Sequence, residues 1–206
     1  MPLRLAVLLS GSGSTLQNLI DHIGRGELAA EITCVLSSRE GVYGLERARN
    51  AGLPALAVPR KEYPGTTAFN DALWREIRTH GADLVVLAGF MTLIEVPADF
   101  HNRIVNVHPA LIPAFCGHKM YGHHVHEAVL AYGAKVSGAT VHFVDGEYDH
   151  GPILMQRCVP VLDDDTPDTL AERVQAMERE IYPQAIQLIA QGRVSVEGRR
   201  VRVRPA

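Results

Sequence analysis

Apolar residues in the first half of the chain form short unbroken runs, and segments of helical periodicity lie between them. The strand-length runs cover residues 3–9, 31–36, 55–58 and 84–88. Apolar residues recur at helical spacing in residues 16–23, 43–51 and 69–77, and each segment ends at or shortly before a glycine. Strands that alternate with helices in this way predict a right-handed, doubly wound parallel sheet.

The second half of the chain departs from this alternation. Residues 103–107 predict a buried strand, and residues 126–132 predict a short helix. Two further apolar runs, at residues 137–144 and 153–161, are separated by one loop that contains glycine and acidic residues. Because they are so close in sequence, we expect these two strands to pair antiparallel.

The C-terminal region predicts one long helix and a hairpin. Thr166 and Pro167 are residue types that start helices, as N-cap and first-turn residue, and the helical pattern continues past Pro183, where we expect a bend. Residues 194–203 predict a terminal hairpin around a Glu-Gly turn. The expected fold is therefore α/β, with a mostly parallel mixed sheet and an antiparallel C-terminal part.

Composition restricts the class of function. The 206 residues are 47% hydrophobic and 21% charged, as in ordinary globular domains, and the net charge of -3 gives no reason to expect nucleic acid as a partner. Cys34, Cys116 and Cys158 lack CxxC spacing, which favours free thiols in a reducing compartment. The N-terminal apolar run is too short for a signal peptide, and no segment has transmembrane length. We expect a cytoplasmic protein without a membrane partner.

The most informative motif follows the strand at residues 103–107. Asn106 and His108 are two apart, so on a continuing strand their side chains project from the same face, and Pro109 and Pro113 stop the strand from extending. An amide and an imidazole are thereby held together where open α/β sheets place their ligands. Asp149, an isolated acid, is the candidate partner of the histidine.

These three residue types suit the stabilisation of a developing oxyanion. An amide and a protonated imidazole both donate hydrogen bonds, and a carboxylate beside the imidazole raises its pKa and holds its orientation. The sequence has no nucleophile elbow such as G-x-S-x-G, so direct transfer of an acyl-like group between two substrates is favoured over acyl-enzyme chemistry. The alternative is a structural histidine at a capped strand end.

The glycine- and serine-rich turn at residues 10–15 is a second candidate site. Glycines permit close approach of a ligand, and the amides at a helix N-terminus favour phosphate. The turn lacks both the third glycine of G-x-G-x-x-G and the Gly-Lys-Ser/Thr ending of a P-loop, which argues against ATP or GTP hydrolysis. The alternative is a plain glycine turn capped by a serine.

A histidine-rich stretch invites a metal-site interpretation, which we do not favour. It contains His118, His123, His124 and His126. No H-E-x-x-H motif and no Cys/His pairing at ligand spacing is present, and Glu127 would lie on a different helical face from His126. We expect a surface loop that leads into a helix, and no metal.

Taken together, the motifs resemble those of the folate-dependent phosphoribosylglycinamide formyltransferases over nearly the whole chain. The resemblance rests on Ser10-Gly11-Ser12-Gly13-Ser14, Ala88-Gly89-Phe90-Met91, Asn106-Val107-His108-Pro109, Val141-His142-Phe143-Val144, Asp149-His150-Gly151-Pro152 and the late helix around Gln175 and Glu178. It implies a Rossmann-like formyltransferase fold in which residues 1–206 form one domain. Residues 1–100 would be its phosphoribosyl-binding half and residues 101–206 its folate-binding and catalytic half.

The resemblance also implies site residues. The ribonucleotide would be bound by Gly13, Ser14, Thr15, Gln175 and Glu178. The co-substrate 10-formyltetrahydrofolate would be bound by Met91, Thr92, Leu93, Ile94, Asn106, Val144 and Asp149. The catalytic residues would be Asn106, His108 and Asp149, with His108 kept protonated by Asp149.

The implied reaction, a step of de novo purine synthesis, is attack of the glycinamide amine on the formyl carbon without a covalent enzyme intermediate. A water near Asp149 would relay the proton toward the folate nitrogen. The implied partners are these two small molecules, with the chain as a monomer or homodimer.

Three alternatives share the core motifs. Methionyl-tRNA formyltransferase is expected to carry a further C-terminal domain and a basic surface, and formyltetrahydrofolate hydrolase an N-terminal regulatory domain and a second histidine where Pro109 stands. Chain length and Pro109 argue against both. The third is a non-catalytic nucleotide-binding sensor, which needs no oxyanion donor with an accompanying acid.

Overall fold

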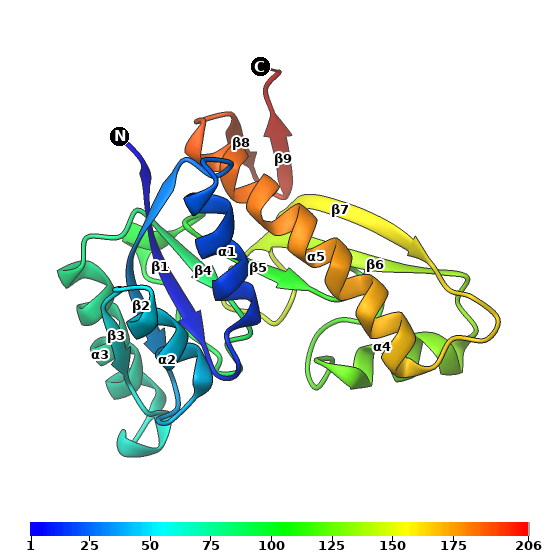
Figure 1. Cartoon of the computed structure of the whole chain (residues 1–206), viewed down its shortest axis with the longest axis horizontal. Coiled ribbons are helices and arrows are strands. Elements are labelled where there is room, and N and C mark those ends of the chain that lie inside the picture. The colour runs from blue at the N-terminus through cyan, green and yellow to red at the C-terminus, as the bar shows by residue number, and fades with distance from the viewer. Residues whose placement is uncertain (206) are drawn as a thin grey trace. The chain divides into compact units, whose positions relative to one another are not determined.

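Four parallel strands form the first half of the protein in a computed structural model, which describes residues 1–205 (Figure 1). β1 (Leu3–Leu9) pairs with β2 (Ala30–Ser37) on one side and with β4 (Leu84–Leu87) on the other, and β2 pairs with β3 (Ala55–Ala57). All of β4 is buried, because helices cover both faces of a sheet of this kind. The four strands expected from the apolar runs are confirmed.

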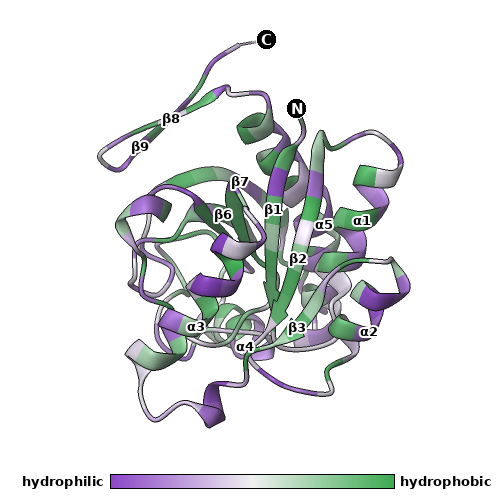
Figure 2. Ribbon diagram, turned by 90° about the vertical axis from the view of Figure 1, so that its left-hand side faces the viewer, coloured by the Kyte–Doolittle hydropathy of each residue, from purple (hydrophilic) through white to green (hydrophobic). Residues whose placement is uncertain are grey.

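Three helices connect these strands. They are α1 (Ser14–Gly24), α2 (Tyr43–Asn50) and α3 (Thr66–Thr79), at the expected positions. The strand order β3-β2-β1-β4 reverses direction after β3, so right-handed crossovers place α3 on the opposite face from α1 and α2 (Figure 2). Single-turn 3-10 helices at Arg60–Glu62 and Ala98–Phe100 were not predicted, because one turn leaves no apolar period in the sequence.

The second half is built around an antiparallel pair. β6 (Val136–Phe143) and β7 (Ile153–Pro160) are hydrogen-bonded antiparallel, as expected. α4 (His123–Tyr132) begins three residues earlier than the sequence pattern indicated, because its first two residues, His123 and His124, are polar and exposed. α5 (Pro167–Ala190) packs on β6, β7 and α4.

The ends of the long helix and of the chain follow the sequence signals. The Thr166 hydroxyl accepts from the backbone N–H of Thr169, Pro167 occupies the first turn, and α5 continues through Pro183 as one helix. β8 (Val194–Glu197) and β9 (Arg200–Val203) form the expected terminal hairpin.

The mixed sheet is confirmed by the hydrogen-bonded strand order β3-β2-β1-β4-β5-β6-β7. In this order β5 (Ile104–His108) lies between β4 and β6. The chain divides into two compact units, Met1–Val105 and Asn106–Ala206, so the boundary between them falls inside β5. No helix in residues 1–205 is both long enough and apolar enough to cross a membrane.

Candidate functional site

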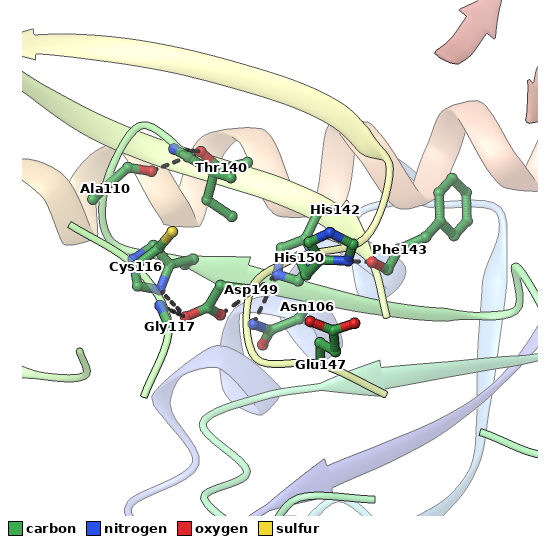
Figure 3. A network of polar contacts seen from close by, with 12 residues as sticks. Asn106, Ala110, Cys116, Gly117, Thr140, His142, Phe143, Glu147, Asp149 and His150 are labelled. Carbon is green, nitrogen blue, oxygen red and sulfur yellow. Dashed lines mark hydrogen bonds and ion pairs between the residues drawn. The ribbon is translucent and has the colours of Figure 1, made fainter. Parts of the chain in front are cut away.

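The candidate catalytic residues lie where β5 ends. Asn106 and His108 occupy alternate positions of β5; Asn106 is half-buried and His108 is 3% exposed. The chain that follows is fixed by the buried Thr140 hydroxyl on β6, which donates to the Ala110 carbonyl (2.6 Å) and accepts from the Ile112 N–H (3.1 Å; Figure 3). The segment that follows β5 is therefore held against β6 by two hydrogen bonds.

Asp149 lies beside this strand end, in the loop of residues 144–152 between β6 and β7, which we call the Asp149 loop. Its Oδ2 is 3.3 Å from His108 Nδ1 and accepts from the Gly117 N–H at 3.0 Å. Its Oδ1 is 3.7 Å from His142 Nε2, and only 11% of its side chain is exposed. The three residues selected from sequence thus converge within one unit of the fold.

The backbone of the Asp149 loop is specialised. Asp149 has a φ of +52°, in the left-handed region that aspartate tolerates better than most residues. Gly151 sits so close to β6 that a Cβ there would lie 1.9 Å from the Phe143 carbonyl oxygen, and the Phe143 N–H donates to the Pro152 carbonyl (2.8 Å). The loop is therefore held against β6 immediately after the candidate catalytic acid.

His142 is a site residue that the sequence reasoning did not select. Its Nδ1 lies 2.9 Å from the Phe143 carbonyl, so it carries the proton, and Nε2 then accepts from the Asn106 amide at 3.2 Å. In Figure 3 it stands between Asn106 and Asp149. The available signal was an imidazole inside an otherwise apolar strand, where burial requires a hydrogen-bonded role.

His108 is engaged at both ring nitrogens. Nε2 lies 2.8 Å from the carbonyl oxygen of Phe115, a residue with the unusual φ of +50°, and Nδ1 faces Asp149. Both contacts are satisfied together only when the ring is protonated, because each acceptor then faces an N–H.

The pKa of His108 differs from the sequence expectation. Burial lowers it most strongly, the Asp149 charge and the Phe115 carbonyl raise it, and His142 lowers it further, so that the net pKa lies below the ordinary value of histidine. Asp149 does favour the charged ring, as expected, but it does not outweigh burial. The Asp149 carboxylate therefore partly offsets the effect of burial and favours the charged form of the His108 ring.

Asp149 itself stays ionised. Burial would raise the pKa of its carboxyl, but the pairing with His142, the charge of His108 and the Gly117 N–H together lower it below the ordinary value. A fixed negative charge therefore faces His108 over the whole physiological pH range.

The glycine turn belongs to the other unit. Gly13 is the N-cap of α1 with a φ of +74°, and no side chain in residues 1–205 caps this helix, so the interpretation as a serine-capped turn is wrong. A Cβ on Gly13 would lie 2.6 Å from the Gly44 Cα, so glycine is required here. The uncapped N–H groups around Ser14 and Thr15 are those that bind anions at helix N-termini.

Polar contacts hold this turn in place. Ser10 is buried; its hydroxyl is 2.8 Å from that of Ser38 and accepts from the Met91 N–H (3.0 Å). Arg47 donates to the Ser12 carbonyl (3.0 Å) and to Gln17 (3.2 Å). The turn is a preformed feature, which suits a fixed anion site.

The other residues assigned by resemblance divide by exposure. Met91 and Leu93 are exposed apolar residues and Thr92 is half-buried. Ile94 is 3% exposed and belongs to the buried core. Val144 is half-buried at the start of the Asp149 loop.

Gln175 and Glu178 are one turn apart on α5, within the second unit. Gln175 is exposed and Glu178 half-buried, and burial of the carboxyl raises the pKa of Glu178 to about 7. A carboxyl with this pKa exists in both protonation states at neutral pH, so it is able to donate or accept a hydrogen bond.

The histidine-rich stretch is mostly exposed, as expected. His123 lies 3.5 Å from Asp168 and His124 lies 3.3 Å from Glu127. His126 instead faces the interior with 2% exposure, and its Nδ1 is buried without a hydrogen-bond partner among the described residues.

Comparisons with known proteins identify the family to which the chain is similar. The model of the formyl transferase family matches residues 3–186. The crystal structure of glycinamide ribonucleotide transformylase 1 from Symbiobacterium toebii is 46% identical, covers 99% of this chain and 95% of its own, and superposes with a TM-score of 0.93. A phosphoribosylglycinamide formyltransferase structure from Coxiella burnetii, in complex with CHES, is 37% identical, with coverage of 98% and 94% and a TM-score of 0.91.

Longer proteins are also similar. The trifunctional purine biosynthetic protein adenosine-3 of Bos taurus is 41% identical over 193 residues, which are 93% of this chain and 19% of that protein. The chain thus spans about a fifth of the length of this trifunctional relative.

Proposed function

The chain belongs to the formyl transferase family, and on that premise we propose that it transfers the formyl group of 10-formyltetrahydrofolate to the amine of 5′-phosphoribosylglycinamide. The convergence of Asn106, His108 and Asp149 at the end of β5 is the observation that carries the proposal. A cationic donor and a neutral donor at one strand end suit a tetrahedral intermediate of acyl transfer. An uncapped helix N-terminus suits the ribose phosphate.

In the proposed reaction the glycinamide nitrogen attacks the formyl carbon, and the bond between that carbon and the folate nitrogen breaks. The oxygen carries negative charge in between. The Asn106 amide, oriented by the hydrogen bond it gives to His142, has its second N–H free to donate to this oxygen. Protonated His108 supplies the charge, and its Nε2–H would turn from the Phe115 carbonyl to the stronger oxyanion acceptor.

The proton balance requires one transfer. The attacking amine loses a proton as the new bond forms, and the folate nitrogen gains one as it leaves. We propose that a water beside the ionised Asp149 relays this proton, while the same carboxylate keeps His108 charged. No covalent bond to the enzyme forms.

The binding roles follow the same division. Gly13, Ser14 and Thr15 would bind the phosphate of the ribonucleotide, and Gln175 and Glu178 would contact the same substrate. Met91 to Ile94 would form a wall against the folate, and the loop from Val144 to Asp149 would surround its pterin. We propose these two small molecules as the partners, without metal or nucleic acid, for a cytoplasmic monomer or homodimer.

A Gly13→Ala variant tests the phosphate assignment. The added Cβ meets the Gly44 backbone, and the φ of +74° is strained for alanine, so the turn must shift. We expect the KM for the ribonucleotide to rise about tenfold or more, with the KM for folate nearly unchanged, because about 1.4 kcal/mol of lost binding is tenfold. Steady-state kinetics measure both constants.

Gly11→Ala is the matched control, because a Cβ at Gly11 meets nothing within 4 Å. Equal effects of the two substitutions on ribonucleotide binding would refute the assignment.

The proposed function itself is tested by following folate product from 10-formyltetrahydrofolate with and without the ribonucleotide. We expect turnover only in its presence. Turnover without it would identify a hydrolase, and ligand binding without any turnover would identify a sensor.

A further inference from the structure

A basic side chain at the end of the C-terminal hairpin contacts the Asp149 loop. Arg199 donates from Nη2 to the carbonyl oxygen of His150 (2.6 Å) and from Nη1 to the Nε2 of the same histidine (3.2 Å). His150 directly follows Asp149 in the chain. Residues 49 positions apart are thus joined by two hydrogen bonds at the proposed catalytic loop.

The hairpin presents Arg199 in a fixed position. β8 and β9 pair from Val194↔Val203 to Glu197↔Arg200, which leaves a two-residue turn of Gly198 and Arg199. Gly198 has a φ of +58°, which glycine adopts readily at the first position of such turns. Since β9 also packs beside β7, the turn has little freedom to move away from the loop.

His150 also forms a hydrogen bond within the loop. Its Nδ1 lies 2.7 Å from the Asp145 carboxylate, whose other oxygen accepts from the Glu147 N–H at 3.2 Å. With the proton on Nδ1, Nε2 is the acceptor that Arg199 requires. Arg199, His150 and Asp145 therefore form a chain of hydrogen bonds that joins the hairpin turn to the loop.

We propose that Arg199 is a positioning residue, which holds the Asp149 loop closed so that Asp149 keeps its left-handed conformation beside His108. This inference rests on the proposed function, in which the same loop surrounds the pterin. Asp149 adopts a φ of +52° that it would leave in a free loop, so external contacts are needed to maintain it. Arg199 supplies one from outside the strands that flank the loop.

Opening of the Asp149 loop would affect the reaction by changing the pKa of His108. Burial lowers the pKa of His108 most strongly, Asp149 and the Phe115 carbonyl raise it, and His142 lowers it further; His126, whose own pKa burial lowers, is a further titratable neighbour. A loop that opens part of the time weakens the Asp149 contribution, which raises the pKa of His108, and lessens the burial, which lowers it. The pH dependence of the rate should therefore change, and the KM for folate should rise.

The test compares Arg199→Ala with Arg202→Ala, a matched exposed arginine of the same hairpin that pairs instead with Glu197 (3.0 Å). We expect faster amide hydrogen exchange in residues 145–151 only in Arg199→Ala. We also expect kcat/KM for folate to fall about tenfold, since small misplacements of catalytic groups are costly, and the alkaline limb of the rate profile to differ from that of the wild type and of Arg202→Ala. Arg199→Lys, which keeps one donor group for the His150 carbonyl, should restore part of the rate.

The outcomes separate the inference from the function on which it rests. Active wild-type protein with an Arg199→Ala variant that matches Arg202→Ala in exchange, rate and pH profile would overturn the positioning role alone. Faster exchange with unchanged kinetics would overturn it too, because the contact would then be merely structural. A wild-type protein without ribonucleotide-dependent turnover would overturn the proposed function.

Discussion

Replacement of His108 by alanine is expected to lower kcat by about 10³-fold, the largest effect of any single substitution in the protein. In its protonated form His108 supplies a positive charge 3.3 Å from the Asp149 carboxylate at the strand end. Removing it leaves the oxyanion with the Asn106 amide as its remaining donor. Single-turnover measurements with saturating substrates isolate this chemical step.

Stability must be controlled in the same experiment. His108 and Asp149 form a buried pair, and loss of one partner from such a pair typically costs about 3–5 kcal/mol. His108→Gln retains a hydrogen-bond donor without a titrating charge, so it should fold better than His108→Ala while remaining slow. Turnover of a folded His108→Ala variant within about twofold of the wild type would remove His108 from the mechanism.

Asp149→Asn is expected to have the second-largest effect, about a 10²-fold loss of kcat and a displaced pH profile. Activity requires protonated His108, so it declines as pH rises through the pKa of that ring. Asp149 raises this pKa, although burial keeps it below the ordinary value. Without the carboxylate the pKa falls further, and the alkaline decline therefore begins at lower pH.

Asparagine suits this test because it tolerates the φ of +52° at position 149. Asp163→Asn, which removes an exposed acid paired with Lys135 at 3.0 Å, is the matched control for the loss of one negative charge. A pH–rate profile of Asp149→Asn that superimposes on those of the control and the wild type would contradict the assigned role.

The same two groups contribute to the acid stability of the fold. The folded-state pKa values of Asp149 and His108 both lie below their ordinary values, so the unfolded chain binds more protons at both. The free energy of unfolding should therefore decrease as pH falls below the ordinary pKa of histidine, near 6.5, and again as the pH falls through the lowered pKa of Asp149. In Asp149→Asn the second decrease should be smaller.

Much of the fold could be predicted from the sequence because the patterns that define its strands and helices lie within short segments of the chain. Continuous apolar runs mark buried parallel strands, and β1 has the bounds that its run predicted. The spacing of Asn106 and His108 placed both on one strand face, and Thr166-Pro167 marked the start of α5. Each of these follows from a period or a cap that neighbouring residues define.

The features that sequence did not reveal depend on contacts between distant segments. His142 gains its role only because β6 brings it between Asn106 and Asp149. The carbonyl of Phe115 reaches His108 through a backbone conformation that no propensity predicts for phenylalanine. The net pKa of His108 was misjudged for the same reason, since burial is a property of the folded chain.

We propose that the formyl group is transferred directly to the amine of the ribonucleotide, and we would test this transfer with one labelling experiment. The protein is mixed with both substrates, the formyl carbon of the folate being isotopically labelled, and products and protein are resolved by mass spectrometry during the first turnover. We expect label in the formylated ribonucleotide, none on the protein, and loss of the signal in His108→Ala. Label in free formate, or on the protein itself, would contradict it.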